Sequence, residues 1–543
     1  MTLTMNQALH VSHLTYRYRT REEYALKDIN FQVERGELIL VAGSSGCGKT
    51  TLMRTINGLI PRSYKGGELQ GEIRILGKDP TPLKLADISQ MVGTVLQDPE
   101  RQIIGAYVFN DVAFGLENLA VPRPEMLRRI DNVLDYLEIS HLRDRETHAL
   151  SGGEKQKVAI AGTLVMEPDI LVLDEPLANL DPASVRDALR LIRQLVDAGK
   201  TVLIIEHRVE DVLSIHPHRA LFLEQGQEVY FGDIDGFFQV VNPLEVKLPA
   251  QVAVKRMQEI TPPPPPPRRE RQPDAPPLVV LEDVSFGYTE ERKVLHNIDF
   301  SVHPGDVIAI LGPNGAGKTT LVRHLIGLER PNSGRVLVEG RDTRELSTAQ
   351  IAHTVGFVFQ NPRHMLFAPT VWEELAFGPR NLGFDEERVA RNVERSLRIV
   401  DLEDYADKPP LSLSYGQQRR VGIGAILAME SKILVMDEPT AGQDYKHYTQ
   451  FMDAIVQMPF QSILFITHDI DLAIRYANRV VLLNDGRIVA DGAPEDVLLD
   501  TERLQQCRLH PTTLLEMNIR LLPNTGRFLS LEELAALHRV DVA

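Results

Sequence analysis

Short apolar runs alternate with segments of helical periodicity along the chain. Residues 38–42 and 307–311 are apolar runs bounded by turn-forming residues, a pattern typical of strands buried on both faces of a parallel sheet. The segments 51–59 and 320–328 that follow them have the spacing of helices. Because β-rich and helical segments keep alternating, the pattern predicts an α/β protein with a mainly parallel sheet.

Two longer segments of helical period, residues 124–139 and 386–400, lie at corresponding places in the two halves. Each separates a glutamine-containing stretch from a serine–glycine stretch, and each predicts a helical subdomain. Near the C-terminus, residues 530–537 also have a helical pattern, so we expect the tail to be partly helical.

The correspondence between the halves extends to individual polar residues. Lys49 recurs as Lys318, an offset of 269 residues, and His207 recurs as His468, an offset of 261. Such a nearly constant offset indicates two copies of one domain fused in tandem. We expect a first domain at 1–245, a linker at 246–276, a second domain at 277–500 and a tail at 501–543.

The linker contains six consecutive prolines, residues 262–267, followed by Arg-Arg-Glu-Arg. Such a segment forms neither helix nor sheet and favours an extended polyproline conformation. From Thr261 to Pro277 it could span roughly 50 Å at about 3.1 Å per residue, which suits a tether that lets two copies face each other. A proline-rich ligand for another protein is the alternative interpretation.

Composition limits the class of protein. At 543 residues the chain is too long for one core, and two to four domains are expected. The net charge of −16 gives no general attraction to nucleic acid or to anionic lipid. No apolar run reaches 18 residues, the N-terminus lacks the layout of a signal peptide, and only two cysteines occur. We therefore expect a cytosolic protein that reaches a membrane only through another protein.

A phosphate-loop pattern, Gly-x-x-x-x-Gly-Lys-Thr, follows each of the first two apolar runs, at 43–50 and 312–319. Glycines let successive backbone N–H groups surround a phosphate, and the next helix N-terminus adds positive partial charge. The lysine is expected to reach the β- and γ-phosphates of a nucleotide, and the last threonine to hold Mg²⁺. These residues are Lys49 and Thr50 in the first loop, and Lys318 and Thr319 in the second.

A pair of carboxylates ends a later apolar run in each half, at 170–173 and 433–436. The first carboxylate of each pair suits coordination of Mg²⁺, and the second is placed to polarise an attacking water. The pairs are Asp174 with Glu175, and Asp437 with Glu438.

The segments Leu-Ser-Gly-Gly-Glu-Lys-Gln at 150–156 and Leu-Ser-Tyr-Gly-Gln-Gln-Arg at 413–419 resemble the signature motif of ATP-binding cassette (ABC) ATPases. The resemblance covers both predicted domains. It implies two tandem P-loop NTPase domains of the ABC type, each with a mainly parallel sheet core, an antiparallel β subdomain and a helical subdomain. It also implies ATP and Mg²⁺ as cofactors, and ATP hydrolysis as the activity.

The resemblance assigns roles to individual residues. It makes Gln97 and Gln360 the Q-loop glutamines, Asp181 and Asp444 the D-loop aspartates, and Tyr18 and Tyr288 the tyrosines that stack on adenine. The catalytic residues that it implies are Glu175, Glu438 and the switch histidines His207 and His468. The nucleotide-binding residues that it implies are Tyr18, Gly43, Ser44, Gly46, Cys47, Gly48, Lys49, Thr50, Thr51, Gln97, Ser151, Gly152, Gly153, Asp174, Asp181, Tyr288, Gly312, Asn314, Gly315, Ala316, Gly317, Lys318, Thr319, Thr320, Gln360, Ser414, Gly416, Asp437 and Asp444. The residues expected at Mg²⁺ are Thr50, Gln97, Asp174, Thr319, Gln360 and Asp437.

In this family two cassettes close head to tail around two ATP molecules, so the resemblance implies that the two halves pair within one chain. Ser151 and Ser414 would then each complete the phosphate site of the other half. Opening and closing of the pair would be a population shift driven by ATP.

The regions that follow the Q-loop glutamines, 97–118 and 360–381, resemble the ATPases of energy-coupling factor (ECF) importers of vitamins and metal ions. In that family this region lines a groove in which a coupling helix of a membrane protein docks. The resemblance implies a place on the inner face of the cell membrane. It also implies a transmembrane coupling subunit and a substrate-binding membrane subunit as partners, and a micronutrient as cargo.

Two other functions are compatible with a tandem cassette. The region after the Q-loop could be cassette core that is shared with another type of ABC transporter. Alternatively, the chain could act on ribosomes or nucleic acid, although cassettes of that kind are usually joined by a long charged helix and this linker is short and proline-rich.

Two departures from the family pattern fall on one predicted pocket. Tyr415 stands where the signature motif has glycine, and Glu206 precedes the switch histidine where the second half has Thr467. A tyrosine side chain is unfavourable where the signature motif approaches a phosphate with its backbone. The extra carboxylate of Glu206 is unfavourable because it lies near the negative charge of a nucleotide. We therefore predict that the pocket built from the first phosphate loop and the second signature motif turns over more slowly. The other pocket would then do most of the hydrolysis.

Overall fold

The computed structural model describes residues 6–178, 180–260, 262–289, 293–440 and 442–540. The chain divides into two compact units, which we call the N-terminal unit (1–260 with 442–447) and the C-terminal unit (261–441 with 448–543). Residues 1–5 of the expected first domain, Thr261 of the expected tether and residues 541–543 of the tail lie outside the described residues.

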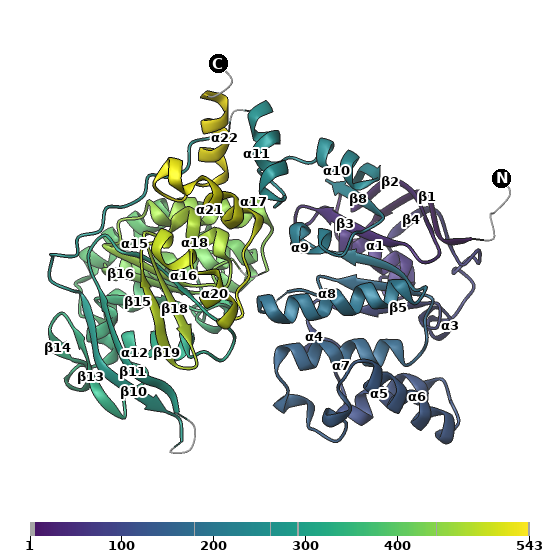
Figure 1. Cartoon of the computed structure of the whole chain (residues 1–543), viewed down its shortest axis with the longest axis horizontal. Coiled ribbons are helices and arrows are strands. Elements are labelled where there is room, and N and C mark those ends of the chain that lie inside the picture. Colours follow the sequence, from purple (N-terminus) through teal and green to yellow (C-terminus); the bar gives the residue numbers. More distant parts are fainter. Residues whose placement is uncertain (1–5, 179, 261, 290–292, 441, 541–543) are drawn as a thin grey trace. The chain divides into compact units, whose positions relative to one another are not determined.

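The N-terminal unit contains one nine-stranded sheet in the order β4-β1-β2-β9-β8-β3-β7-β6-β5 (Figure 1). Its strands are β1 (Gln7–Arg17), β2 (Leu26–Glu34), β3 (Leu38–Gly43), β4 (Glu68–Ile75), β5 (Val92–Val95), β6 (Ile170–Asp174), β7 (Thr201–Ile205), β8 (Arg219–Glu224) and β9 (Gln227–Gly232). The pairs β5 with β6, β6 with β7, β7 with β3 and β3 with β8 are parallel. By contrast, β1 pairs antiparallel with β2 and β4, and β8 with β9.

In the C-terminal unit the strands form two separate sheets. A six-stranded sheet has the order β15-β16-β17-β12-β18-β19, and a four-stranded antiparallel sheet has the order β11-β10-β13-β14. The strands are β10 (Val279–Gly287), β11 (Lys293–Val302), β12 (Val307–Leu311), β13 (Ser333–Val338), β14 (Arg341–Asp342), β15 (Val355–Val358), β16 (Ile433–Asp437), β17 (Ser462–Ile466), β18 (Arg479–Asn484) and β19 (Arg487–Gly492). The α/β fold with a mainly parallel core is therefore confirmed. All residues of β3 and β12 are buried, because these strands lie within the parallel part of their sheets.

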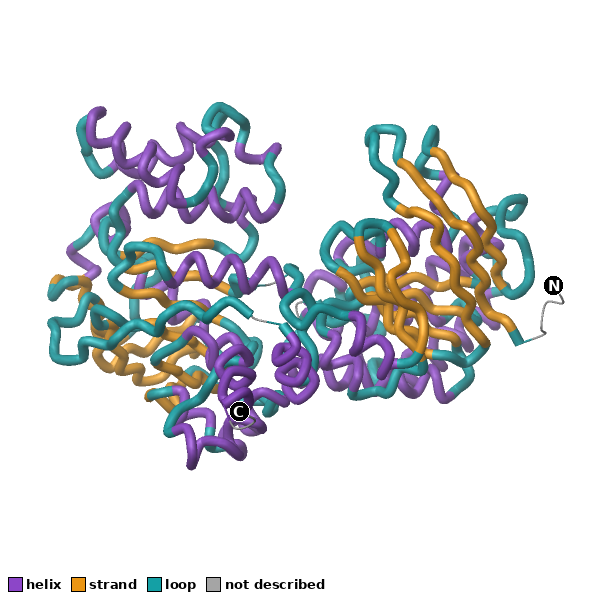
Figure 2. Tube along the Cα trace, turned by 90° about the horizontal axis from the view of Figure 1, so that it is seen from above, coloured by secondary structure: helices purple, strands orange, loops and turns teal. Residues whose placement is uncertain are grey.

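Helices flank the strands in both units (Figure 2). Those of the N-terminal half are α1 (Lys49–Ile56), α2 (Leu59–Arg62), α3 (Leu85–Ser89), α4 (Pro99–Gln102), α5 (Val108–Asn118), α6 (Arg123–Tyr136), α7 (Gly152–Leu164), α8 (Pro182–Asp197), α9 (Val209–Leu213), α10 (Ile234–Val240) and α11 (Ala250–Glu259). Those of the C-terminal half are α12 (Lys318–Leu325), α13 (Thr348–Ala352), α14 (Val371–Asn381), α15 (Glu386–Ile399), α16 (Tyr415–Ala428), α17 (Tyr445–Val456), α18 (Ile470–Tyr476), α19 (Pro494–Leu498), α20 (Thr501–Gln506), α21 (Thr513–Thr525) and α22 (Leu531–Val540).

The predicted helical subdomains are present in both units. The segments 124–139 and 386–400 correspond to α6 and α15, which bury an apolar stripe made of residues such as Ile130 and Val393. Figure 1 shows α5, α6 and α7 gathered at one end of the N-terminal unit. Their counterparts α14, α15 and α16 pack together in the C-terminal unit.

The segment that follows the prolines is anchored to the C-terminal unit. The guanidinium of Arg269 donates to the carbonyls of Val456 (2.9 Å), Met458 and Phe460 (both 2.5 Å), which lie at and beyond the end of α17. Arg268 donates to the carbonyl of Phe528 at 2.7 Å. The segment from Arg268 to Arg271 is thus held on the C-terminal unit, and the role of the prolines as a tether stays a prediction.

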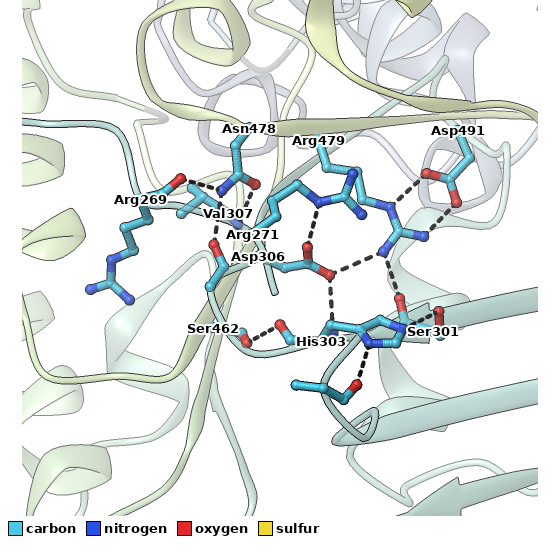
Figure 3. Close-up of polar contacts among 12 residues, drawn as sticks. Arg269, Arg271, Ser301, His303, Asp306, Val307, Ser462, Asn478, Arg479 and Asp491 are labelled. Atoms are coloured by element: carbon cyan, nitrogen blue, oxygen red, sulfur yellow. Dashed lines mark hydrogen bonds and ion pairs between the residues drawn. The ribbon is translucent and has the colours of Figure 1, made fainter. Parts of the chain in front are cut away.

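A buried carboxylate continues this anchor (Figure 3). Asp306, whose side chain has no exposed surface, accepts from Arg271 Nε at 2.8 Å and from Arg479 at 3.1 Å. Arg479 also forms a two-bond ion pair with Asp491, with both distances 2.6 Å. Asn478 donates to the carbonyl of Arg269 at 2.9 Å. Because Asp306 precedes β12, the network fixes the linker to the start of the strand that leads to the second phosphate loop.

The tail packs on the same unit. Arg475 of α18 forms a buried ion pair with Glu532 of α22, and Asn518 of α21 donates to the carbonyl of Leu529 at 2.9 Å. The helix expected at 530–537 is therefore present within α22. Within the part of the chain that the structure describes, no helix has the length and apolar character needed to cross a membrane.

Candidate functional site

Each phosphate loop joins a buried strand to a helix in the same way. Gly43 and Gly312 both have φ +151°, and a Cβ there would lie 2.3 Å and 2.1 Å from the carbonyl oxygens of Leu223 and Leu483. No side chain fits at such distances, so glycine is required at both positions. Gly48 has φ +110° and begins α1 with its backbone in the left-handed region.

The loop lysines are buried and held by the loops themselves. Lys49 Nζ donates to the carbonyls of Gly43 at 2.7 Å and Ser44 at 2.9 Å, and Lys318 makes the same two contacts with Gly312 and Pro313. A buried ammonium beside the backbone N–H groups of a helix N-terminus is a donor set that fits a phosphate. The predicted phosphate-binding role thus fits the geometry of both loops.

The first carboxylates of the Asp–Glu pairs lie next to these loops, and Asp174 is buried whereas Asp437 is half-buried. Burial, and then the charge of Glu175, raise the pKa of Asp174 to about 6. Burial likewise raises the pKa of Asp437, which accepts a hydrogen bond from Thr319 Oγ1 at 2.9 Å. Carboxylate and hydroxyl oxygens are the ligands that Mg²⁺ prefers, so this donor set fits the predicted metal, which would favour the ionised carboxylate.

The second carboxylates are held in strained backbone beside the switch histidines. Glu175 and Glu438 have φ +48° and +46°, a region that non-glycine residues rarely adopt and that is concentrated at functional sites. His207 Nε2 lies 3.0 Å from Glu175 Oε1, and His468 Nδ1 lies 3.0 Å from Glu438 Oε1. Gln97 donates to Glu175 Oε2 at 2.5 Å. The structure therefore brings together, in each unit, the glutamate and histidine that were predicted to be catalytic.

The predicted adenine-stacking tyrosines occupy matching positions. Tyr18 Oη lies 3.2 Å from Thr51 Oγ1 and accepts from Arg54 at 3.3 Å. Tyr288 Oη lies 3.3 Å from Thr320 Oγ1 and accepts from an arginine at the same place in α12, at 3.2 Å. Stacking on adenine stays a prediction. The two arginines, Arg54 and Arg323, were missed from sequence, although each lies five residues after its phosphate-loop lysine.

The signature serines begin helices in both units. Ser151 accepts from Glu154 N at 3.4 Å, and the Glu154 carboxylate accepts from Ser151 N at 2.7 Å. Ser414 and Gln417 form the same reciprocal cap at 3.4 Å and 2.9 Å. Helix N-termini of this kind suit an anion. Which phosphate each signature motif contacts stays a prediction.

The predicted D-loop aspartates also cap helices. Asp181 Oδ1 accepts from Ser184 N at 2.9 Å at the start of α8, and Asp444 Oδ1 accepts from His447 N at 2.9 Å near the start of α17. Their role toward a nucleotide stays a prediction.

Glu206 is directed toward backbone donors. Its side chain is 2% exposed and accepts from Leu177 N at 2.8 Å, His207 N at 3.1 Å and Arg208 N at 3.4 Å. Burial, and then Glu175, raise its pKa to about 7. The repulsion between Glu206 and the phosphates of a nucleotide is therefore smaller than that of a fully charged carboxylate, because Glu206 is only partly ionised near neutral pH.

The fold and the sites define a protein with two P-loop nucleotide-binding domains. The family described as ABC transporter matches residues 26–178 and 295–441, more than half of the chain. The chain therefore belongs to the ABC transporter family, and it is an ATPase that binds ATP with Mg²⁺ and hydrolyses it.

Relatives match this chain over most of their own length. A Bacillus cereus protein named "Putative ABC transporter ATP-binding protein" is 35% identical over 546 residues, covering 94% of this chain and 95% of that protein. A Methanosarcina acetivorans protein of the same name is 36% identical over 546 residues, covering 92% and 88%. The solved structure of cbiO1 from Clostridium perfringens, described as part of the ABC transporter complex cbiONQ, has a TM-score of 0.40 and 28% identity. It covers 49% of this chain and 100% of that chain.

Proposed function

We propose that this chain energises the import of a micronutrient, a vitamin or a metal ion, through partner subunits that span the membrane. It would work on the cytoplasmic side, with its two halves pairing within one chain. The partners would be a transmembrane coupling subunit and a substrate-binding membrane subunit, as in energy-coupling factor importers.

The observation that carries the proposal is an apolar surface after the Q-loop of each unit. In the N-terminal unit Ile104 is 61% exposed and Phe114 of α5 is 49% exposed. At the corresponding positions of the C-terminal unit, Phe367 is 62% exposed and Phe377 of α14 is 51% exposed. The two phenylalanine rings lie edge to face, with centroids 4.8 Å apart.

A buried carboxylate holds each of these loops in place. Asp111 Oδ1 accepts from the backbone of Ile104 at 2.8 Å and of Gly105 at 2.9 Å. Glu374 Oε2 accepts from the backbone of Phe367 and Ala368, both at 2.8 Å. Each loop is thus fixed while its large apolar side chain faces solvent.

Such a surface favours a protein partner. Exposed apolar residues that are gathered on a fixed surface mark interaction sites, whereas scattered ones need no explanation. A short helix of a membrane subunit, with apolar residues along one face, would bury these side chains. ATP-driven movement of the cassettes would then be passed to the membrane subunit at this contact.

The test is copurification from membranes. The tagged chain, expressed together with its neighbouring genes, should be recovered from detergent-solubilised membranes with proteins that span the membrane several times. The variant Phe367→Ser/Phe377→Ser should lose these partners while the isolated chain keeps its basal ATP hydrolysis. Tyr136→Ser is the control, since Tyr136 is 45% exposed but lies on α6, outside the segments 97–118 and 360–381.

Other outcomes identify the alternatives. Recovery with ribosomes and without membrane subunits would reject the proposal in favour of a translation-associated cassette. The chain would belong to another type of ABC transporter if it were recovered with membrane subunits that export a substrate. The same conclusion would follow if its membrane subunits needed a soluble binding protein for import.

A further inference from the structure

Two residues that differ between the halves form one contact in the C-terminal unit. Tyr415 and Arg419 lie one turn apart on α16, with the Arg419 guanidinium 4.9 Å from the centre of the Tyr415 ring. The guanidinium also donates to the Tyr415 hydroxyl at 3.3 Å. Arg419 is buried, at 2% exposure, whereas the tyrosine is 40% exposed.

This pair reaches the Q-loop of its own unit. The Tyr415 hydroxyl donates to the carbonyl of Gln360 at 3.0 Å, and Arg419 donates to the same carbonyl at 3.3 Å. Arg419 donates in addition to the carbonyl of Pro439, the residue after Glu438. One guanidinium therefore joins the signature helix, the Q-loop and the turn that carries the catalytic carboxylate.

The N-terminal unit lacks this arrangement among its described residues. Gly152 and Gln156 occupy the corresponding positions, and the buried amide nitrogen of Gln156 has no hydrogen-bond partner there. Its signature helix instead meets the segment after the Q-loop through Gln102, which donates to the carbonyl of Ala159 at 3.3 Å and to Thr163 Oγ1 at 3.1 Å. An ion pair of Lys155 with Glu100, at 2.5 Å, adds to this link. Glu100 is 69% exposed in this pair.

The two links differ in their chemistry. An exposed ion pair between flexible side chains contributes little and is screened by salt. Hydrogen bonds from a guanidinium to backbone carbonyls are charge-assisted, and a buried guanidinium depends on them because its desolvation is costly. The link in the C-terminal unit therefore depends on a buried charge, whereas the amide of Gln102 in the N-terminal unit is neutral.

We propose that Tyr415 and Arg419 are positioning residues for ATP hydrolysis. They hold Gln360 and the turn at Pro439 in one rigid body with the signature helix, so that movement of this helix moves both. The N-terminal unit makes its link with different residues, Gln102 and Lys155, and the two nucleotide sites of the chain therefore respond differently to movement of their signature helices. The inference rests on the Q-loop role proposed for Gln360, not on the identity of the membrane partner.

The test uses the full chain, three single variants and the double variant Tyr415→Phe/Arg419→Gln. Tyr415→Phe removes only the hydroxyl and keeps the ring packing. Arg419→Gln introduces the residue of the N-terminal unit. Tyr136→Phe removes the hydroxyl of an exposed tyrosine elsewhere and serves as the control. For each variant, kcat and KM for ATP are measured together with hydrogen exchange of the peptides around Gln360 and Pro439.

Tyr415→Phe is expected to lower kcat by roughly two- to tenfold, which is the rate equivalent of one hydrogen bond, and to leave KM within about twofold. Arg419→Gln should lower kcat further, and the double variant should add little, because both residues act through Gln360. Exchange should accelerate around Gln360 and not in α12. Unchanged kcat and unchanged exchange in Tyr415→Phe would overturn the proposal. So would a fall in kcat that is matched by a rise in KM, since that result indicates lost ATP binding.

Discussion

His468 Nδ1 lies 3.0 Å from the carboxylate of Glu438. The matching pair in the N-terminal unit, His207 with Glu175, meets at the same distance but through Nε2. The two units thus place a histidine on the second carboxylate of the Asp–Glu pair with different sides of the imidazole ring. This difference adds to those at Tyr415 and Glu206, and unequal turnover of the two sites stays a prediction.

The two glutamates can be compared directly. We predict that Glu438→Gln removes most of the ATP turnover of the assembled transporter, because loss of a general base costs on the order of 10²–10⁴-fold at the affected site. Glu175→Gln should retain more turnover, because the slower pocket contributes less. Steady-state ATPase rates of the two variants check this, and equal losses would remove the asymmetry.

The raised pKa of Glu206 predicts a pH dependence of stability. Its pKa in the folded protein is about 7, above its ordinary value of 4.5, so its stabilising effect is complete below pH 4.5 and is lost as the pH rises through 7. Between pH 8 and pH 5 the wild type should gain up to about 3 kcal/mol of unfolding free energy relative to Glu206→Gln. Denaturant unfolding of both proteins across this range measures the gain. Parallel pH profiles would contradict the assignment.

The anchor of the linker predicts local destabilisation. Asp306→Ala leaves Arg271 and Arg479 without their shared partner and should destabilise the C-terminal unit by about 3–5 kcal/mol. Arg335→Ala is the control in the same unit, because its ion pair with Glu282 is exposed and should contribute at most about 1 kcal/mol. Thermal unfolding compares the two. Similar small shifts would show that the buried network does not stabilise this unit.

The carboxylates under the apolar loops allow a second test of docking. Glu374→Ala leaves the backbone N–H groups of Phe367 and Ala368 without their acceptor, so the loop should lose its fixed conformation. We predict reduced recovery of membrane subunits, with the basal ATPase rate of the isolated chain unchanged. Glu387→Ala is a suitable control, since that exposed glutamate of α15 forms its ion pair among the described residues with Arg391 of the same helix. Equal recovery in both variants would argue against the loop as the docking surface.

Much of the fold follows from the sequence because it is encoded locally. The run at 307–311 corresponds to β12, and the segment at 386–400 corresponds to α15 within one residue. The phosphate loops are equally local, since glycines and the lysine within eight residues determine their form.

The contacts between residues that are distant in sequence were not predictable in this way. Tyr415 meets Gln360 across 55 residues, and Arg479 meets Asp306 across 173. Neither side chain has a local pattern that names its partner. The orientation of Glu206 toward Leu177 depends likewise on the packing of two loops that are 29 residues apart.

The central claim is that one chain contains two complete phosphate loops that each bind a nucleotide, and binding stoichiometry tests it most directly. The double variant Glu175→Gln/Glu438→Gln, incubated with ATP and Mg²⁺ and separated from free nucleotide, should retain two ATP molecules per chain. Lys49→Ala in this background should reduce the number to one. The account would be contradicted if the double variant retained a single ATP per chain and if Lys49→Ala left that number unchanged.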